Sequence, residues 1–222
     1  WFAWGAGLLT VWGLDVGFVV APTDFQQGEA YRIIFIHVPA AWMSMFVYLV
    51  MAFWGAIGLA FNTRLSFMMA RALAPTGAMF TFVALWTGAW WGKPMWGAWW
   101  VWDARLTSEL ILLFLYVGII ALWAAIDDVK RADRAGSLLT LIGAINVPII
   151  YFSVRWWNTL HQGATIKPSG TSMDAIMLQG MLVMAFAAWF YTIAVALVRV
   201  RRIILERERH TEWVKALLQK EV

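Results

Sequence analysis

The chain has 222 residues, of which 62% are hydrophobic and only 14% are charged, and its mean hydropathy is +0.69. Soluble globular domains carry about 25% charged residues, so this composition excludes an ordinary water-soluble domain and predicts a protein embedded in lipid. The formal net charge is only +4, and the absence of cysteine excludes disulfides, thiol relays and iron–sulfur clusters.

Long apolar runs separated by short charged clusters indicate six membrane-spanning helices. Each run is close to the roughly 20 residues that cross a hydrocarbon core about 30 Å thick. The predicted spans are Phe2–Val20, Val38–Phe61, Leu73–Trp90, Leu106–Ile126, Ser137–Val154 and Ala175–Val198. We therefore expect an all-α polytopic membrane protein that forms a single domain over residues 1–222. Because the chain opens at Trp1 without Met, we expect the natural protein to begin earlier.

Lys and Arg are distributed unequally between the two sets of loops. On the side of both termini lie Arg64, Arg71, Lys130, Arg131, Arg134, Arg199, Arg201, Arg202, Arg207, Arg209, Lys215 and Lys220. On the other side lie only Arg32, Lys93, Arg105, Arg155 and Lys167. The positive-inside rule assigns the richer side to the cytoplasm. Both termini are therefore predicted to be cytoplasmic, and three loops are predicted to face outward.

The tail, about residues 199–222, alternates charged residues with apolar ones. Trp213, Val214, Leu217 and Leu218 have the spacing of one face of a helix. Such a helix would lie on the inner membrane surface, where basic residues meet anionic lipid, or would dock a cytoplasmic protein.

Two of the three histidines are predicted to lie outside the membrane. His37 ends the first outer loop, about residues 21–37, and His161 lies in the third, residues 155–174. His210 belongs to the tail and is expected to be a solvated surface residue. Two imidazoles approaching from opposite sides suit six-coordinate haem iron, whereas a lone interfacial histidine is more often a hydrogen-bonding residue. Both interpretations stay open at this point.

The second outer loop, about residues 91–107, is rich in tryptophan. Six tryptophans fall among the 13 residues from Trp90 to Trp102. Indole rings offer large rigid apolar faces that suit the covering of a flat macrocycle at the water boundary. An aromatic belt is the alternative, but a belt distributes rings over many span ends. The glycines and Pro94 are expected to prevent a continuous helix here and to fold the loop over the membrane surface.

Two charged residues follow the tryptophans. Asp103 and Arg105 flank Ala104, so they are candidates for an ion pair that fixes the loop. Alternatively, the Arg105 guanidinium would meet a carboxylate of a bound haem, since arginine pairs well with carboxylates.

The run Trp96–Thr107, WGAWWVWDARLT, resembles the signature of the tryptophan-rich haem-handling family. Members of this family carry such a loop on the outer face between two spans. Within it, the protein C branch of cytochrome c maturation has six spans, with one histidine in the first outer loop and one in the third. His37 and His161 match those positions, and the resemblance covers essentially the whole chain. The haem lyase and cytochrome c synthase branches are usually longer and have more spans.

The resemblance implies a function and a set of site residues. It implies that the chain binds haem b, transiently and without a covalent bond, at the periplasmic side of a bacterial inner membrane. His37 and His161 would be the axial ligands of the haem iron, and the other contacts would come from Trp91, Trp96, Trp99, Trp100, Trp102, Asp103 and Arg105. The absence of a covalent haem site agrees with a haem that is passed on.

The resemblance also implies partners. The chain would deliver haem to a membrane-anchored haem chaperone, maturation protein E. It would do so within an ABC-type complex with maturation proteins A (the ATPase), B (a membrane partner) and D (a small helper). The sequence has no Gly-x-x-x-x-Gly-Lys-Ser/Thr motif, so ATP hydrolysis by a P-loop would belong to a partner. We therefore expect a haem-handling component that is not an enzyme and has no nucleic-acid partner.

Two further classes of protein remain as alternatives. A membrane electron carrier with two histidine ligands usually holds them inside helices, whereas His37 and His161 are predicted at span ends. A transporter that moves haem through its own pore needs polar groups at mid-membrane, and the predicted spans hold chiefly Asp15, Glu109 and Asn146. Glu109 lies about one turn below the tryptophan-rich loop and is expected to form a hydrogen bond near the site.

Overall fold

The computed structural model describes residues 1–161, 166–167 and 170–220, which are mostly helical. The helices are α1 (Phe2–Asp15), α2 (Ile34–Phe61), α3 (Arg64–Trp96), α4 (Ala104–Ala125), α5 (Val129–Gly143), α6 (Asn146–Trp156), α7 (Ala175–Arg207) and α8 (Glu212–Lys220). A π-helical segment, Val16–Val20, extends α1, and a 3-10 helix, Glu29–Ile33, precedes α2. The short strands β1 (Ile166–Lys167) and β2 (Gly170–Thr171) pair antiparallel.

Among the described residues, six helical stretches are long and apolar enough to cross a membrane. They are Phe2–Val20, Glu29–Phe61, Arg64–Trp96, Ala104–Ala125, Val129–Trp156 and Ala175–Arg207. The predicted all-α polytopic fold and its six spans are therefore confirmed.

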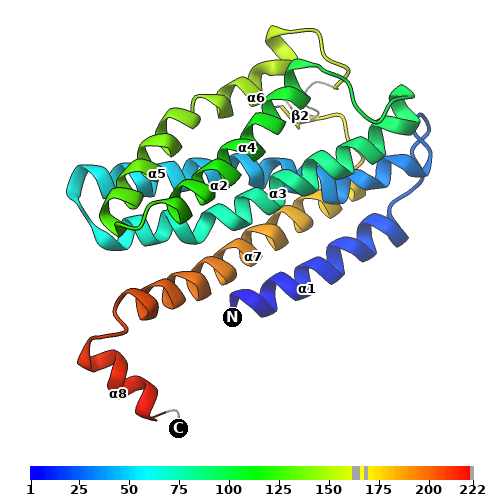
Figure 1. Ribbon diagram of the computed structural model, residues 1–222. Helices are drawn as coiled ribbons and strands as arrows, with labels where there is room; N and C mark the ends of the chain where they lie inside the picture. The colour runs from blue at the N-terminus through cyan, green and yellow to red at the C-terminus, as the bar shows by residue number, and fades with distance from the viewer. Residues whose placement is uncertain (162–165, 168–169, 221–222) are drawn as a thin grey trace.

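The helices form a bundle around the long antiparallel pair α2 and α3 (Figure 1). Helices α4, α5 and α6 cover one side of this pair, and α7 lies along the other side. Helix α1 packs mainly on α7 at the edge of the bundle. The amino-terminus and α8 lie toward one end, and the tryptophan-rich segment lies toward the other (Figure 1).

Close contacts between small and aromatic residues hold the centre of the bundle. Lipid tails are as apolar as side chains, so membrane helices associate mainly through packing and hydrogen bonds. Tyr116 of α4 is fully buried and donates a hydrogen bond to the Ser44 carbonyl oxygen at 2.8 Å. Its ring lies directly over Gly77 of α3, where any side chain would collide with it.

One buried carboxylate joins three helices at the end opposite the tryptophan-rich segment. Asp133 of α5 is 4% exposed. It accepts a hydrogen bond from Arg71 Nε of α3 at 2.7 Å and two from Arg207 of α7 at 2.9 Å. Buried charges persist only when they are paired. Asp133 therefore fixes the mutual position of α3, α5 and α7 at this end.

The prediction that glycines and Pro94 prevent a continuous helix in the second outer loop is wrong for the first half of that loop. Helix α3 continues through Pro94 to Trp96 and ends at Gly97, whose φ of 75° is a left-handed helix terminus. A proline removes one helical hydrogen bond, and α3 tolerates this loss at Pro94 as it does at Pro75. The non-helical part of the loop is therefore shorter than expected.

The second span begins earlier than predicted. The 3-10 helix Glu29–Ile33 runs directly into α2, so His37 lies in the first turn of a helix and not at the end of a loop. No glycine or proline separates the two segments, and the chain therefore keeps its helical direction.

The fifth span, predicted as one run from Ser137 to Val154, contains a break. Helix α5 ends at Gly143 and α6 begins at Asn146. Pro148 has no N–H to donate to the Ala144 carbonyl oxygen, which accepts instead from Val147 N at 3.1 Å. The Asn146 side chain donates to the Ser108 carbonyl oxygen of α4 at 2.8 Å. The break is thus held against α4.

The last span is longer than predicted and takes up the first part of the tail. Helix α7 extends to Arg207, and the separate helix α8 follows. In α8, Val214 is buried whereas Trp213 is 48% exposed and donates from Nε1 to Glu208 at 3.0 Å. The side chain of Leu218, the last member of the predicted apolar stripe, lies outside the described residues. Whether α8 meets lipid or another protein stays a prediction.

The orientation in the membrane can be tested with single cysteines, because the chain has none of its own. Lys93 and Arg131 are both exposed. Lys93 lies near the end of α3 and Arg131 near the start of α5, and these two helix ends lie at opposite ends of the bundle (Figure 1). We expect an impermeant thiol reagent, added to cells with a permeabilised outer membrane, to label a cysteine at Lys93 and not one at Arg131. Labelling at Arg131 alone would reverse the orientation. Lys167, a third outer position by sequence, has a side chain outside the described residues.

Candidate functional site

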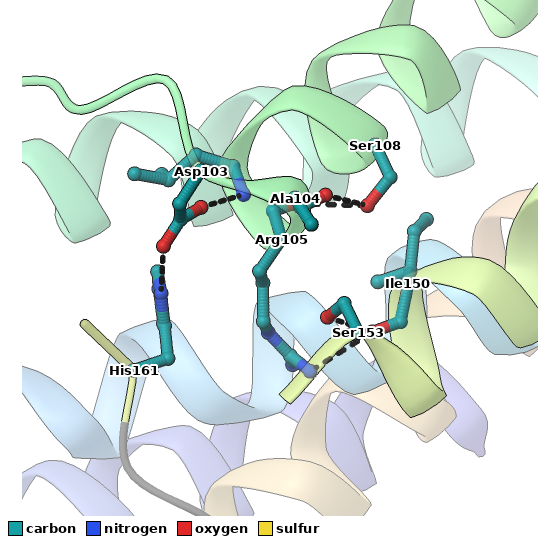
Figure 2. A network of polar contacts seen from close by, with 8 residues as sticks. Asp103, Ala104, Arg105, Ser108, Ile150, Ser153 and His161 are labelled. Atoms are coloured by element: carbon teal, nitrogen blue, oxygen red, sulfur yellow. Dashed lines mark hydrogen bonds and ion pairs between the residues drawn. The ribbon is translucent and has the colours of Figure 1, made fainter. Parts of the chain in front are cut away.

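Asp103 connects the start of α4 with His161 (Figure 2). Its Oδ1 accepts a hydrogen bond from the Leu106 backbone N–H at 2.8 Å and so caps the amino-terminus of α4. Its Oδ2 lies 3.3 Å from His161 Nδ1. A carboxylate only accepts hydrogen bonds, so Nδ1 of His161 carries the proton. Nε2 of the neutral ring therefore keeps its lone pair.

His161 is held in its neutral form. Burial lowers the pKa of this imidazole below its ordinary value, and the nearby Arg105 guanidinium lowers the pKa further. Asp103 acts in the opposite direction through its charge and its hydrogen bond. Near neutral pH the ring is thus available as a ligand, and protons compete for it only at lower pH than for an ordinary histidine.

His37 has the same arrangement with different partners. Its Nδ1 lies 3.0 Å from the Ala84 carbonyl oxygen and 3.1 Å from Thr87 Oγ1, both on α3. Thr87 donates its own hydroxyl proton to the Val83 carbonyl oxygen at 2.6 Å, so its oxygen accepts from the histidine. Since a carbonyl is only an acceptor, Nδ1 of His37 is the protonated nitrogen. Nε2 of His37 is again the free nitrogen.

A tryptophan from the carboxyl-terminal end of α3 packs edge-on against each histidine. Trp91 meets His37 at a ring separation of 5.6 Å, and Trp96 meets His161 at 4.9 Å. The two tryptophans are separated by about one and a half helical turns, roughly 8 Å along the axis. The structure therefore brings His37 and His161, distant in sequence, to the same end of α3.

The other tryptophans of the segment pair with one another. The ring centroids of Trp99 and Trp90 are 5.2 Å apart, and those of Trp100 and Trp102 are 5.3 Å apart. Trp102 is 74% exposed, which is unusual for so large an apolar side chain. The Trp100 Nε1 atom is buried and has no hydrogen-bond partner among the described residues. A buried donor without a partner calls for an explanation, and this one is open to a further group.

Arg105 does not form the ion pair with Asp103 that was one of its two predicted roles. Asp103 is engaged by His161 and by the backbone of α4, and within the described part of the chain Arg105 forms no ion pair. Its Nη1 donates to the Ile150 carbonyl oxygen of α6 at 3.2 Å (Figure 2). The guanidinium has five N–H donors, so most remain for another acceptor.

The structure adds residues that sequence reasoning missed. Thr87 and Gly88 both contact His37, and Gln27 accepts a hydrogen bond from Trp91 Nε1 at 3.0 Å. No local pattern distinguishes them, because each acts across helices. Glu109, expected to form a hydrogen bond near the site, is buried and accepts one from Ser44 Oγ at 2.7 Å.

Comparison with known proteins decides the family. The family model described as "Heme exporter protein C" matches residues 1–215. The chain belongs to the heme exporter protein C family. This confirms the resemblance seen in the tryptophan-rich segment.

Individual relatives agree over most of their length. The heme exporter protein C of Escherichia coli (strain K12) is 50% identical over 99% of this chain and 89% of its own length. That of Bradyrhizobium diazoefficiens is 50% identical over 93% of the chain and 79% of the relative. A putative cytochrome c biosynthesis ccmC-like mitochondrial protein of Marchantia polymorpha is 45% identical over 92% of the chain and 86% of the relative.

Gly88 gives a direct test of the position of His37. A Cβ atom at Gly88 would lie 3.0 Å from His37 Cε1, so Gly88→Ala must displace the imidazole. Groups that orient metal ligands typically change affinity by roughly 10–100-fold when mutated. We expect the variant to shift the His37 ring signals in 15N NMR and, with His37 as a candidate haem ligand, to lose haem affinity to about this extent.

Gly118→Ala in α4 is the matched control. Nothing lies within 4 Å of a Cβ at Gly118, so this variant should keep full haem affinity and gain roughly 0.5–1 kcal/mol of helix stability. Equal behaviour of the two variants would contradict the assigned position of His37.

Proposed function

We propose that this protein binds haem b reversibly at the periplasmic face of a bacterial inner membrane and presents it for the maturation of c-type cytochromes. Relatives named heme exporter protein C, and one named for cytochrome c biosynthesis, support this general role. The six spans support a multi-pass membrane location. Residues 1–222 act in this proposal as one haem-handling unit.

One observation carries the assignment of the ligands. His37 and His161 each use Nδ1 for a hydrogen bond to an oxygen atom, and each therefore points the lone pair of Nε2 away from that partner. Ligating histidines in metalloproteins are oriented in this way. In our proposal the two Nε2 atoms are the axial ligands of the haem iron. The bound haem is cargo, which a chain without cysteine holds without a covalent bond.

The remaining predicted residues have separate roles in the proposal. Trp91 and Trp96 fix the histidine rings from the side. Trp99, Trp100 and Trp102 cover the macrocycle, and the unpaired Trp100 N–H is a donor for it. Arg105 pairs with a haem propionate, since among the described residues its guanidinium donates only one hydrogen bond, to the Ile150 carbonyl oxygen. Asp103 is a positioning residue, because it acts through His161.

The partners follow from the family. We infer a membrane-anchored haem chaperone, maturation protein E, as the receiver of the haem. Maturation proteins A, B and D would complete an ABC-type complex as the ATPase, the membrane partner and the small helper, and the ATPase would be its enzyme. The haem lyase and cytochrome c synthase branches are less compatible with the match to residues 1–215.

A membrane electron carrier is a second candidate, because His37 lies inside α2 as ligands of such carriers do. The two functions differ in what leaves the protein. A haem-presenting protein loses its haem to the chaperone, whereas an electron carrier keeps it through repeated oxidation and reduction.

Replacing either outer histidine tests the proposal. His37→Ala and His161→Ala should each abolish the low-spin spectrum of two-histidine haem, because one axial position becomes vacant. Delivery of haem to the chaperone should stop, and added imidazole should restore it in part. Absorption spectra in the Soret and α-band regions, together with a haem-transfer assay, measure both effects.

His210→Ala is the control, since His210 is exposed in the tail and contacts Arg209. It should leave spectrum and transfer unchanged. An unaltered low-spin spectrum in either outer variant would exclude that histidine as a ligand and would make Met95 or Met173 the next candidate.

A further inference from the structure

Asp15 of α1 takes no part in the proposed haem site, yet its position is unusual. Helix α1 packs mainly on α7 and lies at the edge of the bundle (Figure 1). The side that meets α7 is made of small and buried residues, such as Ala6 and Gly13. The opposite side is open, and Asp15 is exposed on it.

The open side of α1 is a continuous apolar stripe. Its large members are Trp4 (77% exposed), Leu8 (69%), Val11 (70%), Trp12 (48%) and Val19 (74%). At about 100° per residue, Asp15 falls at the centre of this stripe. We call these five residues and Asp15 the Asp15 face. In a membrane, this face meets either lipid or another protein.

Hydrocarbon is an unfavourable environment for the carboxylate. Asp15 lies five residues before Val20, the end of the first span, which is roughly 8 Å inside that end. Aspartate has a short side chain and cannot extend to the interface as lysine and arginine do. No described residue of the chain forms a hydrogen bond or an ion pair with the Asp15 carboxylate. Ionisable groups at such positions are generally paired.

The backbone next to Asp15 is also irregular. The helix changes to a π-helix at Val16, directly after Asp15. Gly17 in this segment lies against the Phe35 ring of α2. Short π-helical segments occur frequently where a helix has a functional role. The irregular segment adds a second local feature beside the unpaired carboxylate.

We propose that the Asp15 face binds a transmembrane helix of a different membrane protein, which presents a Lys or Arg side chain to Asp15 at the same depth. The charge of Asp15 decides which of the possible neighbours occupies this face. Lipid tails offer no donor to a carboxylate. A second copy of this chain, packed by two-fold symmetry, would bring two Asp15 carboxylates together, and like charges in a low-dielectric contact repel. A basic residue on a different membrane protein satisfies both constraints.

This inference rests on the membrane complex of the proposed function but does not depend on the haem site. The test uses the full chain, expressed together with its natural partners in its native membrane. Asp15→Asn keeps the size of the side chain and removes the charge, and Asp15→Lys reverses it. We expect Asp15→Lys to reduce recovery of the intact membrane complex by more than about tenfold, and Asp15→Asn by less. Both should keep the low-spin haem spectrum.

Ile111→Lys in α4 is the matched control. Ile111 is 45% exposed and lies at a comparable depth from the outer end of its helix. Ile111→Lys places a lysine on the exposed side of α4 and leaves the Asp15 face unchanged, so the complex should be recovered normally. Recovery of the complex at the normal level with both Asp15 variants would overturn the proposal.

Photocrosslinking identifies the occupant. A photoreactive amino acid at Val11 should crosslink to one partner span, and one at Phe114 of α4, which is 63% exposed, should not. Exchanging the basic residue of that span for Asp should restore the complex formed by Asp15→Lys. Crosslinks from Val11 only to lipid, or only to a second copy of this chain, would overturn the proposal, as would failure of the charge exchange.

Discussion

The hydrogen bonds of one carboxylate connect the fold to the candidate site. Asp103 Oδ1 accepts from the backbone of α4 and Oδ2 meets His161, so the same residue starts a membrane span and orients a proposed ligand. Its conformation is extended, as a helix cap requires, and its side chain lies beside His161. If Asp103 moved, the start of α4 and the tautomer of His161 would change together.

The lipid environment explains why several buried polar side chains form hydrogen bonds between helices. In hydrocarbon each unpaired polar group is costly, so buried polar side chains serve as joints between helices. Glu109 joins α4 to α2 through Ser44, Asn146 joins α6 to α4, and Asp133 joins three helices at the end opposite the tryptophan-rich segment. These joints hold α2, α3 and α4 in place and thereby fix His37 and Asp103 relative to each other. Asp15 forms no such joint with the described part of the chain, and this led to the inferred partner surface.

The sequence predicts much of this organisation, because lipid imposes a simple rule on composition. The six spans and the family were found from local patterns, and the outer positions of His161 and the tryptophans stay a prediction. Helix ends were less predictable. Helix α3 continues through both Pro75 and Pro94, whereas the fifth span breaks just before Pro148, where Asn146 is bonded to α4.

The contacts of the site were the least predictable part. His37 is oriented by Ala84 and Thr87, which are almost fifty residues away in the sequence, and neither has a distinctive local pattern. The contact between Asp103 and His161 was also missed. Arg105 lies two residues from Asp103 and was therefore the expected partner, whereas His161 is distant in the sequence. Cross-helix packing decides such contacts, and a single sequence does not encode it in any local motif.

The central claim is that both histidines bind iron through Nε2 while Nδ1 stays bound to protein oxygen atoms. Pulsed EPR of the ferric haem complex, prepared with 15N-labelled histidine, measures which nitrogens are bonded to the iron. The account predicts two strongly coupled histidine nitrogens, of which one disappears in His37→Ala and the other in His161→Ala. A single coupled nitrogen in the unmodified protein, or coupling through Nδ1, would contradict it.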